Sequence, residues 1–119
     1  MKTAAKPVTT PVLNLVSAVN QALDQALEQD PRVILLGEDI GRNGGVFRAT
    51  EGLWKKHGEE RVVDTPLAEI GIMGSAIGLA VSGMRPVAEL QIDGFMPAVF
   101  DQVVSHLGRI PSRSRRRLS

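Results

Sequence analysis

Cysteine and tyrosine are absent from the 119 residues, and histidine occurs only twice, at His57 and His106. The absence of cysteine excludes disulfide scaffolds, thiol redox centres, cysteine nucleophiles and the usual structural zinc sites. Since the two histidines lie far apart in the sequence with no carboxylate at ligand spacing, we expect no metal site on this chain. The composition is typical of a reducing compartment, so the expected location is the cytoplasm, or the mitochondrial matrix in a eukaryote.

No apolar run approaches the roughly 20 residues that a membrane span needs, and the first residues lack a signal-peptide core. A membrane is therefore not expected as a partner. With 43% hydrophobic and 23% charged residues, the chain is typical of one folded globular domain.

The net charge of +1 conceals an uneven distribution, because five arginines lie between residues 109 and 117. Without them, nine basic residues stand against thirteen acidic ones, and residues 1–108 carry about −4. A basic tail is one way to bind nucleic acid, with an affinity that falls steeply with salt. However, Trp54 and the three phenylalanines are not interleaved with the arginines, so no stacking platform accompanies them and nucleic acid is not expected as a partner.

Hydrophobic periodicity and breakers divide the chain into alternating helices and strands. Residues 1–12 are expected to be a flexible lead-in and residues 111–119 a basic tail, with the domain between them at 13–110. The spacing predicts helices from Asn14 to Asp30, over 50–57, over 69–82 and from Pro97 until Gly108, where the pattern ends. Strands are predicted at 33–36, 61–63 and 87–91, with turns at 64–66 and 93–94.

This alternation predicts an α/β fold in which a parallel sheet is flanked by helices. Three strands leave an exposed sheet edge, which folded proteins usually cover. In the third helix, Gly71, Gly74 and Gly78 share one face at a cost of about 1 kcal/mol per glycine. We interpret this face as a contact surface for another helix.

Polar residues follow each predicted strand, where open parallel sheets bind ligands. Glu38 and Asp39 follow the first strand, the segment 64–69 follows the second, and Gln91 and Phe95 follow the third. An ionised Glu69 would be stabilised at the start of its helix. Spacing alone leaves open that these are ordinary solvated carboxylates. The glycines of the loop 41–45 match no phosphate-binding motif and favour a tight turn.

Several longer strings occur in a characteristic order, and they are VILLGEDI (33–40), GGVFRATEGL (44–53), RVVDTPLAE (61–69), GIMGSAIG (71–78), RPVAELQ (85–91) and DQVVS (101–105). Together they closely resemble the beta subunit of the thiamine-diphosphate-dependent decarboxylating component of 2-oxo acid dehydrogenase complexes. The resemblance covers roughly residues 13–110. It implies part of a transketolase-like pyrimidine-binding domain.

The resemblance implies that thiamine diphosphate is shared with an alpha subunit, which supplies Mg²⁺ and the pyrophosphate site. Glu69 matches the glutamate that hydrogen-bonds the aminopyrimidine ring. A carboxyl group shared with a ring nitrogen in a dry pocket promotes the imino tautomer, whose nitrogen takes the proton from the thiazolium carbon. Glu38 matches a second acid, on a polar path between paired active sites. Leu67, Gln91 and Phe95 match positions that line the cofactor, although tyrosine is common at the last of these.

The family's reaction is oxidative decarboxylation of pyruvate or a branched-chain 2-oxo acid, with acyl transfer to a lipoyl domain. The implied partners are an alpha subunit, in an alpha2beta2 assembly, and the lipoyl acyltransferase core. Family members continue well past residue 119 and carry there a histidine for acyl transfer, so the chain is expected to be an amino-terminal fragment that is inactive alone. Alternatives are a non-catalytic module that binds an alpha subunit, a nucleic-acid binder, and a transketolase-like or deoxyxylulose-phosphate-synthase-like enzyme.

Overall fold

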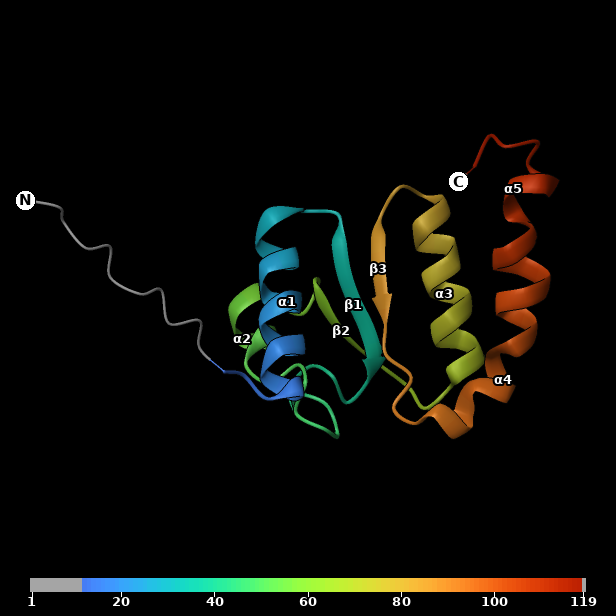
Figure 1. The fold of residues 1–119 in the computed structure, drawn as a ribbon. Helices are drawn as coiled ribbons and strands as arrows, with labels where there is room; N and C mark the ends of the chain where they lie inside the picture. The colour runs from blue at the N-terminus through green and yellow to red at the C-terminus, as the bar shows by residue number, and fades with distance from the viewer. Residues whose placement is uncertain (1–11, 119) are drawn as a thin grey trace, which may run out of the picture.

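A computed structural model describes residues 12–118, and its centre is a three-stranded parallel sheet in the order β2-β1-β3 (Figure 1). The strands are β1 (Val33–Glu38), β2 (Val62–Thr65) and β3 (Arg85–Ala88). Leu35 pairs with Val62 on one side and with Val87 on the other. The predicted α/β fold with a parallel sheet is confirmed.

Helices cover both faces of this sheet (Figure 1). On one face, α1 (Leu15–Gln29) and α2 (Leu53–His57) enclose a buried cluster, namely Leu27, Val33, Leu35, Ile40, Leu53 and Val62. On the other face, α3 (Glu69–Val81) packs Ile72 and Ala76 against Leu36. Because successive residues of β1 face opposite layers, its continuous apolar run is buried on both sides.

The boundaries of α1 follow the predicted signals. The side chain of Asn14 accepts a hydrogen bond of 2.8 Å from the backbone N–H of Ser17, which caps the amino end of the helix. The helix stops at Gln29, and the extended backbone of Asp30 precedes Pro31 as expected.

Three predicted boundaries are wrong. Helix α2 starts at Leu53 rather than Thr50, because the Thr50 hydroxyl donates to the carbonyl of Ile40 at 2.7 Å within a turn. Asp64 and Thr65, predicted in a turn, complete β2 through their pairing with β1. The third strand occupies 85–88 rather than 87–91, and it accommodates Pro86 because β3 is an edge strand.

The carboxyl-terminal segment is helical well beyond Gly108, which also differs from the prediction. It comprises a 3-10 turn η1 (Asp93–Phe95), α4 (Met96–Asp101), a π-helical stretch η2 (Gln102–His106), a 3-10 turn η3 (Leu107–Arg109) and α5 (Ile110–Arg113). Pro97 and Pro111 sit in first turns, where a missing N–H costs nothing. Gly108 lacks the positive φ of a helix-ending glycine, so the chain continues to coil.

Of the predicted flanking segments, the lead-in lies outside the described residues except for residue 12, and the basic tail begins inside α5. Between residues 12 and 118, no helix combines the length and hydrophobicity that a bilayer crossing requires.

Candidate functional site

The carboxyl ends of the three strands lie along one edge of the sheet, where α3 and η1 also begin (Figure 1). Glu38 is the last residue of β1, and it pairs in register with Thr65, the last residue of β2. Glu69 opens α3 four residues later. The topology therefore gathers the predicted Glu38, Leu67, Glu69, Gln91 and Phe95 at this rim.

Gln91 and Glu38 are brought into direct contact. The side-chain amide of Gln91 donates to the backbone carbonyl of Glu38 at 3.3 Å, and both residues are half-buried. Glu69 is also half-buried, and within residues 12–118 no hydrogen bond joins its carboxyl group to that of Glu38. Among the described residues, neither carboxyl group forms an ion pair or a side-chain hydrogen bond.

Thr65 lies within the predicted segment 64–69, but the sequence prediction did not single it out. Its hydroxyl is the buried side-chain polar atom without a hydrogen-bond partner in the described part of the chain. It borders a cavity of about 230 Å³, lined by Thr65, Pro66, Ala68, Gly71, Ile72 and Ser75, which flanks the start of α3. A buried orphan hydroxyl is costly unless something else bonds to it, so this cavity is suited to a polar ligand atom.

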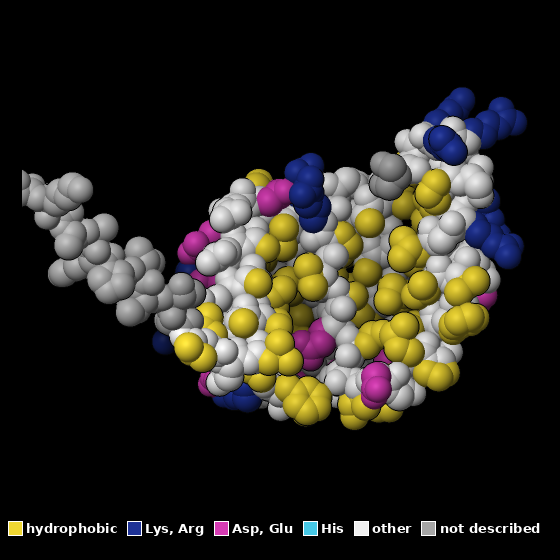
Figure 2. All heavy atoms as spheres, in the orientation of Figure 1, with side chains coloured by type: hydrophobic (Ala, Val, Ile, Leu, Met, Phe, Trp, Pro, Cys, Tyr) yellow, Lys and Arg dark blue, Asp and Glu magenta, His cyan; other side chains and the backbone are white. Residues whose placement is uncertain are grey.

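Leu67 and Phe95 provide apolar surface at the rim. The side chain of Leu67 is 69% exposed and that of Phe95 is 38% exposed. Figure 2 shows that hydrophobic side chains gather across the middle of the visible face. Neither residue belongs to the buried clusters of the sheet, so both are available to contact a flat ring.

The segment after Glu38 is held by Asp64. The Asp64 carboxylate accepts hydrogen bonds from the backbone N–H of Gly41, at 2.5 Å, and from that of Arg42, at 3.3 Å. A side chain on Gly41 would collide with this carboxylate, because a Cβ there would lie 2.5 Å from Asp64 Oδ2. The predicted tight turn follows, with φ values of 76° and 80° at Gly44 and Gly45.

A further acid, Glu89, was not expected at this end of the sheet. Its backbone N–H donates to the carbonyl of Leu36 and so extends the pairing of β3 with β1. The Cβ of Glu89 lies close to Gly37, since a Cβ added to Gly37 would be only 3.0 Å from it. Burial raises the pKa of the Glu89 carboxyl group. The proton of this group is therefore held more tightly than that of a solvated glutamate.

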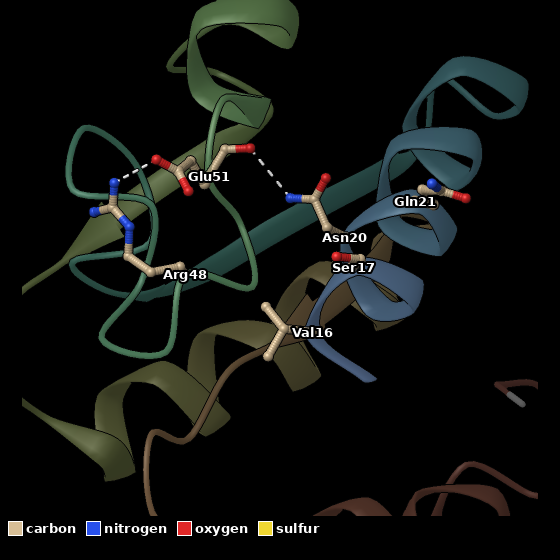
Figure 3. Close-up of a pocket in the computed structure, with 6 residues that line it drawn as sticks. All are labelled: Val16, Ser17, Asn20, Gln21, Arg48 and Glu51. Carbon is tan, nitrogen blue, oxygen red and sulfur yellow. Dashed lines mark hydrogen bonds and ion pairs between the residues drawn. The ribbon is translucent and has the colours of Figure 1, made fainter. Parts of the chain in front are cut away.

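A separate hollow of about 330 Å³ lies between α1 and the segment 48–51 (Figure 3). Asn20 donates there to the carbonyls of Ala49, at 2.9 Å, and Glu51, at 3.1 Å, while Arg48 pairs with the Glu51 carboxylate. None of the predicted site residues lines this hollow. The Asn20–Glu51 contact drawn in Figure 3 fastens the loop to α1, whereas the Arg48–Glu51 pair lies within the loop.

The glycine face of α3 is largely uncovered. A Cβ at Gly78 would meet nothing within 4 Å, and one at Gly74 would meet only the side-chain oxygen of Gln102, at 3.7 Å. No backbone of the described chain approaches this face closely, and the predicted contact with another helix stays a prediction.

Residues 12–114 match the family described as transketolase, pyrimidine binding domain. The chain belongs to this family. It is 51% identical over 104 residues to the pyruvate dehydrogenase E1 component subunit beta of Acholeplasma laidlawii, covering 87% of this chain and 32% of the relative. The corresponding subunit of Leifsonia xyli subsp. xyli is 55% identical over 101 residues, 85% of this chain and 30% of the relative. The 2-oxoisovalerate dehydrogenase subunit beta of Bacillus subtilis is 50% identical over 103 residues, with shares of 87% and 32%.

The resemblance found in the sequence is thereby confirmed, and the chain spans about a third of the length of these relatives. The rim of this pyrimidine-binding domain fits a pyrimidine chemically. It offers carboxyl groups for ring nitrogens, an unpartnered hydroxyl at Thr65, and apolar surface at Leu67 and Phe95. Within residues 12–118 no group of three or more metal-ligating side chains occurs.

Proposed function

We propose that this chain is the amino-terminal part of the beta subunit of a 2-oxo acid dehydrogenase E1 component, acting on pyruvate or a branched-chain 2-oxo acid. The names of the similar proteins support the reaction class. The observation that carries the proposal is the position of Glu69 at the start of α3, directly after Ala68, which lines the cavity bordered by the unpartnered Thr65 hydroxyl.

In this proposal Glu69 holds a proton at a ring nitrogen of the aminopyrimidine of thiamine diphosphate, and Leu67 and Phe95 contact the ring. Gln91 fixes the end of β1 through the Glu38 carbonyl, and the Glu38 carboxyl group serves as a second acid. Thiamine diphosphate, when bound, supplies the carbon nucleophile and electron sink for decarboxylation.

The partners in this proposal are an alpha subunit, which carries Mg²⁺ and the pyrophosphate site in an alpha2beta2 assembly, and a lipoyl acyltransferase core that accepts the acyl group. The chain alone is proposed to be inactive, because the full activity needs the alpha subunit and the rest of a beta subunit. The proposed location is the cytoplasm.

The test uses a chimeric beta subunit in which residues 12–114 replace the matching segment of the Acholeplasma laidlawii relative, co-expressed with that organism's alpha subunit. We expect oxidative decarboxylation of pyruvate by the chimera. Glu69→Ala should lower turnover at least about 100-fold, the usual contribution of a positioned acid or base, with assembly intact. The control is Glu60→Ala, an exposed glutamate distant from the rim.

Two results would count against the proposal. A chimera that assembles but does not turn over pyruvate or a branched-chain 2-oxo acid contradicts the reaction class. Unchanged turnover in Glu69→Ala contradicts the role of that residue.

The uncovered glycine face favours a second candidate, a non-catalytic module that binds an alpha subunit. This candidate predicts that the 119-residue chain binds the alpha subunit with the same affinity whether or not thiamine diphosphate and Mg²⁺ are added. Binding that strengthens with the cofactor favours the enzyme subunit instead.

A further inference from the structure

Seven lysines and arginines lie between residues 12 and 108, and four of them have their partners outside residues 41–55. Arg32 and Arg85 pair with Asp30, Lys56 pairs with Asp24 and Glu28, and Arg61 donates to backbone carbonyls. The other three, Arg42, Arg48 and Lys55, line one hollow beside α2. Positive charge is therefore concentrated at one place on a body that is acidic overall.

This hollow has a volume of about 360 Å³, and its wall consists of Gly41, Arg42, Asn43, Gly44, Arg48, Glu51, Gly52, Trp54 and Lys55. Of the three glycines in this wall, Gly41 and Gly44 are buried, and only Gly52 is exposed. At Gly52 the backbone adopts φ 79°, and a Cβ there would meet nothing within 4 Å. The hollow is thus open to a small molecule on the side of Gly52.

The guanidinium group of Arg42 lies over the indole ring of Trp54, with its carbon 5.2 Å from the ring centroid. A guanidinium group over an aromatic face can still donate its N–H groups to an oxyanion. Within the described residues, neither Arg42 nor Lys55 forms an ion pair with a carboxylate. Two cations of this hollow are therefore available to a ligand.

Arg48 and Glu51 set the remaining charge of the wall. Arg48 pairs with the Glu51 carboxylate at 2.5 Å and also donates to the Asn43 carbonyl. Its backbone has φ 61°, a conformation uncommon for arginine, so the fold holds this side chain in place at a cost. Three cations and one carboxylate give the wall a net charge of about +2.

We propose that this hollow is a binding site for the phosphate group of a small molecule. A phosphate dianion matches the charge of the wall, and its oxygens suit the fork of Arg42 together with the ammonium group of Lys55. The site lies on the α2 side of the sheet, whereas Glu69 opens α3 on the opposite side (Figure 1). Its wall contains none of the residues predicted for the pyrimidine rim, and its test does not depend on the proposed enzymatic function.

Trp54 makes the proposal directly testable on the 119-residue chain. It is the only tryptophan and tyrosine is absent, so the tryptophan emission reports on this hollow alone. We expect a saturable change in emission on titration with inorganic phosphate at constant ionic strength. Adenosine monophosphate is titrated in parallel. Tighter binding than that of inorganic phosphate shows that the hollow also contacts the nucleoside, and equal binding shows that it contacts the phosphate group alone.

Variants assign the site to its residues. Lys55→Gln changes an exposed side chain and should weaken phosphate binding about tenfold, the effect of losing one charge-assisted hydrogen bond. Lys55→Arg should retain binding. The matched control is Arg85→Gln, which removes an exposed cation distant from the hollow. Because Arg42→Gln alters the surroundings of Trp54, its binding is followed by the amide NMR shift of Gly52, with the same tenfold loss expected.

Three results would overturn the site. The first is an emission change that does not saturate, and the second is the same change with chloride at equal ionic strength. The third is equal phosphate affinity in Lys55→Gln, Arg42→Gln and Arg85→Gln, each checked for native circular dichroism.

Discussion

Thr50 and Thr65 both carry buried hydroxyl groups, but only that of Thr50 has a partner within the described chain. Replacing Thr65 by valine removes an unsatisfied polar atom and keeps the shape of the side chain. We expect Thr65→Val to raise the free energy of unfolding of the chain alone by about 1 kcal/mol. Urea denaturation followed by circular dichroism measures the change.

Thr50→Val is the matched control for this experiment. It leaves the carbonyl of Ile40 without its donor, so we expect the free energy of unfolding to fall by about 1–2 kcal/mol. If both variants destabilise the chain equally, the Thr65 hydroxyl has a partner within the fold and is not a ligand group.

Asp30 should make the folding stability of the chain depend on pH in the acid range. Its carboxylate accepts hydrogen bonds from Arg32, which lower its pKa to about 2, and Arg85 adds a weaker attraction. A pKa that is lower in the folded than in the unfolded chain stabilises the fold above the ordinary aspartate value near 4. This contribution is lost as the pH falls from about 4 to about 2.

The pKa of Asp30 is measured from the chemical shift of its carboxyl carbon during an NMR titration. In Asp30→Asn, the stability lost between pH 4 and 2 should be smaller than in the parent chain. Titration of Asp30 near pH 4 would show that the arginine contacts do not hold in solution.

At the scale of elements, α3 carries glycines that the described chain does not require. Gly78 has open space at its Cβ position and no positive φ, so Gly78→Ala should stabilise the isolated chain by up to about 1 kcal/mol. If the glycine face packs against a partner helix, the same methyl group should weaken binding of the alpha subunit. Thermal unfolding and a binding titration measure the two effects.

Gly44→Ala is the contrasting variant for the same measurements. Gly44 has φ 76°, and a Cβ there would lie 2.7 Å from the Cα of Glu51. We expect this variant to lose stability. Equal stability changes at Gly44 and Gly78 would contradict the assigned backbone conformations.

The sequence predicts elements well where local signals decide them. The Asn14 cap and Asp30-Pro31 delimit α1, and the apolar run of β1 reveals a strand buried on both faces. The sequence does not predict the limits of β2 and β3, because these depend on pairing with β1. Thr65 is a strand residue because it pairs with β1, and Pro86 is tolerated because β3 is an edge strand.

The candidate site follows the same division. The parallel topology predicts that Glu38 and Gln91 meet at one rim, and a hydrogen bond now joins them. The hydrogen bond between Asp64 and Gly41 joins residues 23 positions apart, and no local sequence pattern predicts it. Thr65 was not singled out for a similar reason, because its place in β2 depends on pairing with Glu38 of β1.

At the scale of the whole molecule, the segment 93–109 exposes one apolar face along its length. Val99 is buried and Val103 is half-buried, but Leu107 is 45% exposed. The exposed apolar residues of this face are about one helical turn apart, and they are Met96, Phe100, Val104 and Leu107. A contiguous apolar face of this kind marks a surface that associates with protein.

We therefore expect the chain alone to self-associate with increasing concentration, aided by a net charge of only +1. Phe100→Asp combined with Val104→Asp should abolish association and keep the fold, because both side chains are exposed, whereas Asp101→Asn should leave association unchanged. Sedimentation velocity over a hundredfold concentration range measures this, and a parent chain that stays monomeric contradicts the expectation. If the aspartate pair also prevents binding of the alpha subunit, self-association and subunit assembly compete for the same face, and adding alpha subunit should dissociate the parent oligomer.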